Sequence, residues 1–264
     1  MEAREDMEKS DITSGPTHRI HIYRHAQCRV KGRYAYRNIW KNRDHLYVVY
    51  IAIVQAPNMT AIVDTGVANI AKMNEGAGFL LTKPMWQEPG EDTLSILEKA
   101  GIVGEAVDYV FLTHCHYDHC SNLNLFPNAN IVIPEHAWNV WHEQPDGANY
   151  LHDGFLEELE DLNAAGRLIR CDEGLITPGI GVRYVGGHCP CSQFVYINTE
   201  QGVAVLTGDT VQMVANLEQN DVIGIWYDDE ECWNALDIAR STADIVLPGH
   251  DPRVFERYPN GIIE

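Results

Sequence analysis

The chain has 264 residues, 45% of them hydrophobic, which is enough to bury a large core. Its formal net charge of -19 excludes nucleic acid as the expected partner, because the protein would repel the phosphates. No segment approaches the ~20 consecutive apolar residues of a membrane span, and the first twenty residues lack the apolar stretch of a secretory signal. We therefore expect a cytoplasmic protein with no membrane partner, whose seven cysteines are reduced thiols.

In chain order, residues 1–17 are polar and charged, and we expect a frayed tail there before a single domain at residues 18–264. Within that domain, apolar β-prone runs end in polar or glycine residues, and segments between them carry apolar residues at helical spacing. The runs predict strands at residues 46–54, 60–63, 109–112, 182–185, 203–207 and 245–247, and the spacing predicts helices at residues 91–101, 150–166 and about 229–239. This alternation predicts an α/β fold in which two mixed β-sheets pack face to face between helices, an αββα sandwich.

The most informative segment follows the predicted strand at residues 109–112. It places His114, His116, Asp118 and His119 within six residues. Imidazole nitrogens and carboxylate oxygens are ligands for divalent metals such as zinc, and loops after strand ends are where α/β proteins carry their chemistry. The segment therefore predicts a metal site.

Four further strand ends carry candidate site residues. Asp64 follows the strand at 60–63, and His188, Asp209 and His250 follow the last three predicted strands, each behind a glycine that permits a tight turn. A lone histidine is more commonly a hydrogen-bonded loop residue, but beside the histidine-rich segment we assign His188 and His250 as ligands. Asp64 alone is equally well explained by an Asx turn before a glycine.

Other histidines and cysteines are not assigned to the metal. The cysteines near the motifs are Cys115, Cys120, Cys189 and Cys191, and the Cys189-Pro190-Cys191 spacing is too tight for the usual zinc knuckle. On a predicted helical segment, surface or capping roles are expected for His136, His142 and His152, and packing roles for Trp138 and Trp141.

These motifs, in this order, resemble those of the metallo-β-lactamase superfamily over roughly residues 45 to 258, and the ending Gly249-His250-Asp251 with Phe255 and Tyr258-Pro259 is similar to its N-acyl homoserine lactonase group. The resemblance implies two divalent metal ions. One is held by His114, His116 and His188, and the other by Asp118, His119 and His250, while Asp209 bridges them and Asp64 hydrogen-bonds around the site. Zinc is the expected metal, and manganese, iron and cobalt are alternatives.

The resemblance also implies a metal-dependent hydrolase that opens a lactone. A hydroxide held between the metals attacks the carbonyl, and Asp118 and Asp209 are the catalytic residues, with Asp118 passing a proton to the leaving oxygen. The chain departs from the lactonase group at Gln212, where that group carries a tyrosine, and at Ser192, where it carries a second histidine. We expect the Gln212 amide to bind the substrate by a hydrogen bond.

Several alternatives remain open. A thioesterase, an aryl esterase or a ring-amide hydrolase would use the same metal site, an iron-dependent oxidoreductase of the same fold would need iron, and a non-catalytic binding protein would be expected to lack ligands. The expected partner is a small molecule with an ester or lactone carbonyl. Hydrophobic residues at 79–81 and 85–86 could line its entrance or form a homodimer interface.

Overall fold

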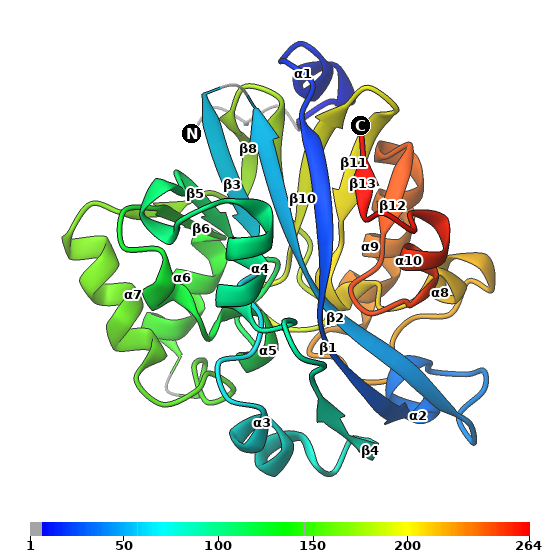
Figure 1. The fold of residues 1–264 in the computed structure, drawn as a ribbon. Coiled ribbons are helices and arrows are strands. Elements are labelled where there is room, and N and C mark those ends of the chain that lie inside the picture. Colours follow the sequence, from blue (N-terminus) through cyan, green and yellow to red (C-terminus); the bar gives the residue numbers. More distant parts are fainter. Residues whose placement is uncertain (1–6, 57, 145) are drawn as a thin grey trace.

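Two β-sheets face each other in the computed structural model, which describes residues 7–56, 58–144 and 146–264 (Figure 1). The first sheet consists of β1 (Arg19–Lys31), β2 (Asp44–Ala56), β3 (Met59–Val63), β4 (Leu81–Trp86), β5 (Tyr109–Phe111), β6 (Asn130–Ile133), β7 (Leu168–Arg170) and β13 (Ile262–Ile263). The second sheet consists of β8 (Glu173–Thr177), β9 (Ile180–Tyr184), β10 (Gln193–Thr199), β11 (Gly202–Leu206) and β12 (Ile245–Leu247).

Both sheets are mixed. The first has the strand order β13-β1-β2-β3-β5-β6-β7, with β4 also paired to β1, and its strands from β3 to β7 in that order are parallel. The second has the order β12-β11-β10-β9-β8, and only its β11–β12 pair is parallel. This is the predicted arrangement of two mixed sheets.

Helices cover both outer faces of this sandwich. Their bounds are α1 (Lys9–Thr13), α2 (Gly32–Ala35), α3 (Ile70–Ala77), α4 (Thr93–Ala100), α5 (Tyr117–Cys120), α6 (Glu135–Glu143), α7 (Phe155–Ala164), α8 (Val214–Glu218), α9 (Asp229–Thr242) and α10 (Arg253–Arg257), with 3-10 turns at Gly104–Ala106, Leu123–Leu125 and Gly208–Thr210. Helices α4, α6 and α7 lie on the first sheet, and α9 lies on the second (Figure 1). No helix among the described residues is long and apolar enough to cross a membrane.

The main core lies between the two sheets. Val63 and Phe111 of the first sheet pack in one cluster with Val195 and Leu206 of the second, and each is at most 2% exposed. Burying an aliphatic or aromatic side chain of this size contributes roughly 1.5–3 kcal/mol relative to leaving it exposed. Tight burial of both inner faces therefore fixes where the strand ends, and the loops after them, lie.

The predicted strands are all present, and the predicted helices differ mainly in their ends. Helix α4 ends at Gly101, which has φ 69°, as expected for a glycine after a helix. Helix α7 begins only at Phe155, later than the predicted residue 150, because Gly154 in front of it has φ 80° and is not helical. Strands β1, β4, β6, β7, β8, β10 and β13 were not predicted; in β1 the alternation of apolar residues changes register at a bulge between Arg24 and Ala26.

Residues 7–17 differ from the frayed tail that we expected up to residue 17. They include α1, in which Ile12 is only 2% exposed, and Met7 is buried beside it. Both side chains pack against Phe194 and Val205 of the second sheet, and Lys9 pairs with Asp244. Two apolar side chains among many polar ones are therefore enough to attach this segment to the sandwich.

Candidate metal centre

Loops that are far apart in the sequence bring together all the side chains that the sequence assigned to the metals. They follow β5 in the first sheet and β9, β11 and β12 in the second. The ligand atoms form three overlapping groups, within each of which all atoms lie within 4.8 Å of one another: His114, His116 and His188; His114, His119 and Asp209; and Asp118, His119 and His250. The structure thus brings all seven predicted ligands to one place.

Three of the imidazole rings are held from outside by their Nδ1 atoms, whereas His116 Nδ1 faces His188 Nε2 at 3.0 Å. His119 Nδ1 donates to Asp64 Oδ2 at 2.7 Å, and His188 Nδ1 and His250 Nδ1 donate at 3.2 Å to the backbone oxygens of Ile225 and Val48. An Nδ1 that donates carries a ring proton, so in the neutral ring Nε2 has a free lone pair that can bind a cation. Outer hydrogen bonds of this kind orient histidines that bind metals.

The inward ring nitrogens of His119 and His250 converge on one carboxylate oxygen of Asp209. His119 Nε2 and His250 Nε2 lie 3.3 and 2.8 Å from Asp209 Oδ1, and His119 Nε2 and His114 Nε2 are buried without a hydrogen-bond partner. Buried nitrogen and oxygen atoms this close together need a proton or a cation between them. Since imidazole and carboxylate are ordinary zinc ligands, the residues present fit a pair of divalent cations.

The protonation of the site follows from burial and from the carboxylates. Burial holds the pKa of His114 well below its ordinary value and lowers that of His116 to about 3, so both rings are neutral and able to bind a metal. Burial would also lower the pKa of His250, but Asp209 raises it. Burial would raise the pKa of Asp209, but His250 and the other nearby imidazoles hold it well below its ordinary value. Burial would likewise lower the pKa of His119, but Asp118 and Asp64 raise it well above its ordinary value. Asp209 is therefore ionised among these imidazoles.

Asp64 organises the histidine-rich loop, although it lies outside the ligand groups. It adopts φ 60°, a left-handed conformation that aspartate tolerates, and this turns its carboxylate towards the start of the loop. Its Oδ1 accepts the backbone N–H of Thr113, and its Oδ2 accepts both the Thr113 hydroxyl and His119 Nδ1, all at 2.7 Å. Asp64 therefore couples the end of β3 to the orientation of a ligand.

Glycines let the ligand loops touch at their backbones. A Cβ on Gly208, which has φ 50°, would lie 2.6 Å from the Thr113 side chain. A Cβ on Gly249 would lie 2.3 Å from the Gly208 oxygen. These distances are too short for any side chain, so Asp209 and His250 reach the centre only because a glycine precedes each of them.

The turn that carries His188 depends on helix α9. Glu231 accepts the backbone N–H of Gly187 and the hydroxyl of Tyr184, both at 2.9 Å, while Asp228 caps the helix by accepting the Glu231 N–H at 2.9 Å. This role could not be predicted, because Asp228 and Glu231 belong to an acidic run that is typical of a solvated surface.

Gln212 lies beside the centre, three residues after Asp209, and both ends of its amide are engaged. Its Nε2 donates to Asp209 Oδ2 at 3.1 Å, and its Oε1 accepts the Tyr47 hydroxyl at 2.6 Å. The Tyr47 ring is stacked on His250, with ring centroids 4.8 Å apart. The sequence predicted neither the contact with Asp209 nor any role for Tyr47.

A cavity of about 570 Å³ opens over the centre. His116, Asp118, His188, Asp209 and His250 line it on one side. The other lining is mainly apolar and aromatic: Val30, Tyr34, Val49, Met73, Ala77, Phe79, Leu80, Leu81, Met85, Tyr117 and Tyr150. Residues 79–81 and Met85 thus line the cavity, which agrees with one of the two uses that we considered for them, a substrate entrance or a dimer interface, but Trp86 is not part of the lining.

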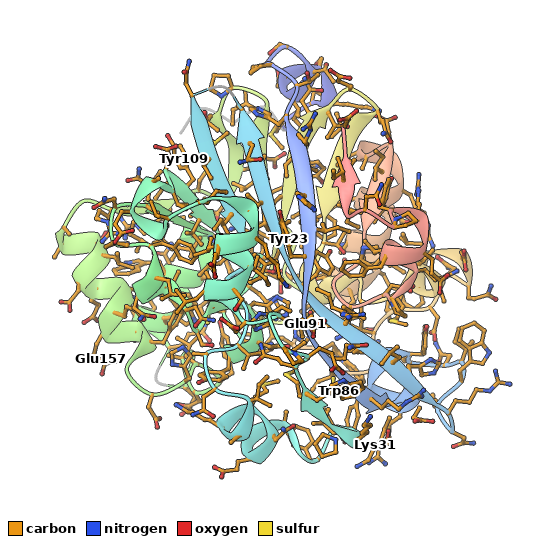
Figure 2. The ribbon with its side chains drawn as sticks, viewed as in Figure 1. Tyr23, Lys31, Trp86, Glu91, Tyr109 and Glu157 are labelled. Atoms are coloured by element: carbon orange, nitrogen blue, oxygen red, sulfur yellow. The ribbon has the colours of Figure 1, made fainter. Side chains whose placement is uncertain are left out.

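The lower wall of the cavity comes from α3, β4 and the lower part of β1. Figure 2 shows Trp86 and Lys31 at this end of the molecule, where β4 pairs with β1. His152 also lines the cavity, although we expected a surface or capping role for it. Trp141 packs in the core against the first sheet, as predicted, and donates its indole N–H to Tyr150 at 2.8 Å. His136 and His142 lie outside the lining.

The cysteines near the motifs lie behind the histidines. Cys191 accepts the backbone N–H of Cys115 at 3.1 Å, and its sulfur lies 3.3 Å from that of Cys189. Burial raises the pKa of each of these thiols, which keeps them protonated. Within the described part of the chain, none of the three ligand groups contains a cysteine.

Comparison with known proteins identifies a family for most of the chain. A model of the metallo-β-lactamase superfamily matches residues 46–250. The N-acyl homoserine lactonase AiiA of Bacillus thuringiensis subsp. kurstaki is 25% identical over 228 residues, which cover 80% of this chain and 86% of that protein.

Solved structures share the fold. A quorum-quenching N-acyl homoserine lactone lactonase superposes with a TM-score of 0.70 at 18% identity, covering 98% of this chain and 100% of that chain. AidC, described as a dizinc quorum-quenching lactonase in complex with a product, superposes with a TM-score of 0.60 at 14% identity, covering 94% of this chain and 90% of that chain. At these identities the superpositions support the fold alone.

Proposed function

The chain belongs to the metallo-β-lactamase superfamily, and on that basis we propose that it is a metal-dependent hydrolase that opens a lactone ring. The observation that carries the proposal is the convergence of five imidazoles and two carboxylates beside one largely apolar cavity. Sequence relatives from Bacillus are named N-acyl homoserine lactonases, and a solved structure of the same fold is described as dizinc.

The three groups of possible ligands support an assignment of residues to each metal. His114, His116 and His188 would hold one cation and Asp118, His119 and His250 the other, with the Asp209 carboxylate between them. When bound, the metals would supply Lewis acidity and an activated water at neutral pH. Zinc suits these nitrogen and oxygen ligands without any thiolate.

Asp118 is the residue that we propose to move the proton. Its side chain is 13% exposed and lines the cavity, and its Oδ2 lies 3.6 Å from His119 Nε2 and 4.0 Å from His250 Nε2. From this position the carboxylate accepts a proton from the attacking water and donates it to the oxygen that leaves when the ring opens. Asp209, which is surrounded by imidazoles, would instead be held between the two cations.

The cavity would select the rest of the substrate. Its wall away from the metals is formed by aliphatic and aromatic side chains, including Val30, Met73, Leu81 and Met85. Such a wall accommodates an apolar substituent, while the polar floor receives the ester carbonyl. An N-acyl homoserine lactone, named for the relatives, combines these two parts.

The proposal is tested on protein purified without added metal. Elemental analysis should find two equivalents of a divalent metal, and a panel of lactones, thioesters, aryl esters and amides should show fastest turnover for a lactone with an apolar substituent. Faster turnover of another substrate class, or full activity after complete removal of metal, would overturn it. Iron as the bound metal together with oxidation of a substrate would favour the oxidoreductase alternative.

The role of Asp118 needs its own variant. Asp118→Asn should lower kcat for the lactone by about 10²–10⁴-fold, since it removes the proton acceptor while keeping the side-chain volume. Asp237→Asn, at a carboxylate that is 82% exposed, is the matched control and should leave kcat unchanged. An Asp118→Asn enzyme with two bound metals and undiminished kcat would remove the assignment.

A further inference from the structure

A buried chain of hydrogen bonds leads from strand β2 to the proposed bridging carboxylate. The Tyr47 hydroxyl donates to Gln212 Oε1 at 2.6 Å, and Gln212 Nε2 donates to Asp209 Oδ2 at 3.1 Å. The three residues are 5%, 3% and 8% exposed, so water does not substitute freely for either bond. Tyr47 lies on β2, and Gln212 lies 165 residues further along the chain, in the loop after Asp209. Each satisfies the hydrogen-bonding potential of the other.

The same strand holds His250. The Tyr47 ring is stacked on the His250 imidazole at 4.8 Å and 22° between planes. The backbone oxygen of Val48 lies 3.2 Å from His250 Nδ1, and the Val48 N–H donates to the His250 oxygen at 3.0 Å. The His250 N–H in turn donates to the Gln212 oxygen at 2.9 Å. Strand β2 and the loop after Asp209 therefore enclose the His250 loop.

We propose that Tyr47 and Gln212 are positioning residues that fix Asp209 and His250 for the cations, and that the Gln212 amide is not a donor to the substrate. The Gln212 Oε1 is occupied by Tyr47, and this turns Nε2 towards Asp209 Oδ2. The other neighbour of that oxygen among the ligands, His188 Nε2, is 3.6 Å away. Without Gln212 the Asp209 carboxylate loses the bond that sets its rotation.

This assignment changes the role that the sequence suggested for Gln212. A substrate contact at this position would need an amide free to turn towards the cavity, whereas the structure holds both of its ends. The proposal rests on the metal-binding part of the proposed function, and it predicts effects that exist before any substrate is added. Residues that support metal ligands in this way contribute about 10–100-fold to metal affinity.

The test measures zinc binding to metal-free protein by competition with a chromophoric chelator. Gln212→Met should weaken binding of at least one of the two equivalents by about 10–100-fold, and Tyr47→Phe, which removes only a hydroxyl, by up to about tenfold. The double variant should lose less than the product of the two single losses, because both act through one chain of bonds. Cobalt-substituted Gln212→Met should show an altered visible spectrum.

A matched control separates positioning from general destabilisation. Tyr196 is also a buried tyrosine whose hydroxyl bonds a single side chain, Thr242, at 3.0 Å, but it lies on β10 away from the metal ligands. Tyr196→Phe should lower the thermal midpoint without changing zinc affinity or the cobalt spectrum. If Gln212→Met fails to fold, the zinc affinity of Tyr47→Phe still tests the proposal, because that variant keeps the aromatic ring and loses only the hydroxyl.

The outcomes distinguish this inference from the proposed function. Zinc binding and cobalt spectra like those of the unsubstituted protein in both variants, with KM for the lactone raised, would overturn the inference and make Gln212 a substrate contact. Weakened zinc binding in both variants supports the inference even if the protein opens no lactone, a result that would overturn the proposed function alone. A protein that binds no divalent metal overturns both.

Discussion

Replacing Asp64 by asparagine tests whether a residue outside the ligand groups sets the metal site. Asparagine has the same shape and also tolerates φ 60°, so the backbone conformation of Asp64 is not disturbed. The substitution changes one carboxylate oxygen into an NH₂ group. Because Asp64 is only 6% exposed, water cannot replace this oxygen as the acceptor for the Thr113 hydroxyl and His119 Nδ1.

The expected magnitude follows from the three bonds that Asp64 accepts. The Thr113 N–H keeps an acceptor in the remaining carbonyl oxygen, and the Thr113 hydroxyl can rotate to accept from the new NH₂. His119 Nδ1–H then faces a donor at a position where it had an acceptor at 2.7 Å. Leaving one buried donor unsatisfied costs about 1–3 kcal/mol of the free energy of unfolding.

The metal site should respond through the His119 tautomer. The imidazole can avoid the clash by moving its proton to Nε2, but that nitrogen then has no lone pair for a cation. We therefore expect Asp64→Asn to weaken zinc binding by about 10–100-fold, in addition to the loss of stability. Chelator competition measures the first effect, and urea unfolding of the metal-free protein measures the second.

Asp108→Asn is the control for this substitution. Asp108 is an exposed aspartate that also accepts a backbone N–H, that of Thr60 at 2.9 Å, but it touches no ligand. Its replacement should change the free energy of unfolding by no more than about 0.5 kcal/mol and leave zinc affinity unaltered. If Asp64→Asn behaved like Asp108→Asn in both assays, the reasoning about His119 would be refuted.

Three further predictions concern stability. Burial lowers the pKa of His25 to about 4, against the raising influence of Asp92 and Glu91, so on acidification the unfolded chain takes up a proton on this histidine before the folded chain does. The contribution of His25 to the free energy of unfolding should therefore be complete above pH 6.5 and fall by about 3 kcal/mol towards pH 4. His25→Gln should flatten this slope in urea unfolding. An unchanged slope would contradict the assignment. Gly249→Ala should lower the thermal midpoint and zinc affinity together, because its Cβ would meet the Gly208 oxygen at 2.3 Å; normal values would show that the loops can separate. Free zinc at 100 times its Kd should raise the free energy of unfolding by about 2.7 kcal/mol per site, and a midpoint insensitive to chelators would argue against a metal site.

The ligands could be predicted from the sequence because each carries a local signal. Asp209 and His250 follow a short apolar strand and a glycine, and the strands before them are buried, so their ends are well defined. The resemblance to the metallo-β-lactamase superfamily was confirmed by the family model, and the two mixed sheets by the structure. Strand β1 was not predicted because its alternating apolar residues change register at a bulge between Arg24 and Ala26, which divides the pattern into two short pieces.

Residues that support the ligands could not be predicted in this way. Tyr47 lies within an apolar run, where tyrosine is an ordinary strand residue, and its partner Gln212 is 165 positions further along the chain. Glu231 lies in an acidic run, yet it holds the turn before His188. His152 lies in the connection between α6 and α7 and lines the cavity because of how that connection runs, which no local sequence pattern indicates. Such contacts depend on the packing of whole elements and leave no periodic pattern.

The division of the ligands between the two sheets explains why support of this kind is needed. His114, His116, Asp118 and His119 follow the first sheet, whereas His188, Asp209 and His250 follow strands of the second. Direct bonds join the sheets here through Gln193 of β10, whose N–H donates to the Thr113 oxygen at 2.8 Å and whose amide donates to the Leu112 oxygen at 2.7 Å. These bonds fix the distance between the sheets, but they do not fix the rotation of a side chain beyond each strand. A pair of cations held between the sheets needs ligands from both sheets in the right orientation at the same time. The bonds of His119 to Asp64, of His250 to Val48 and of Asp209 to Gln212 must therefore set the rotation of these side chains before the metal binds.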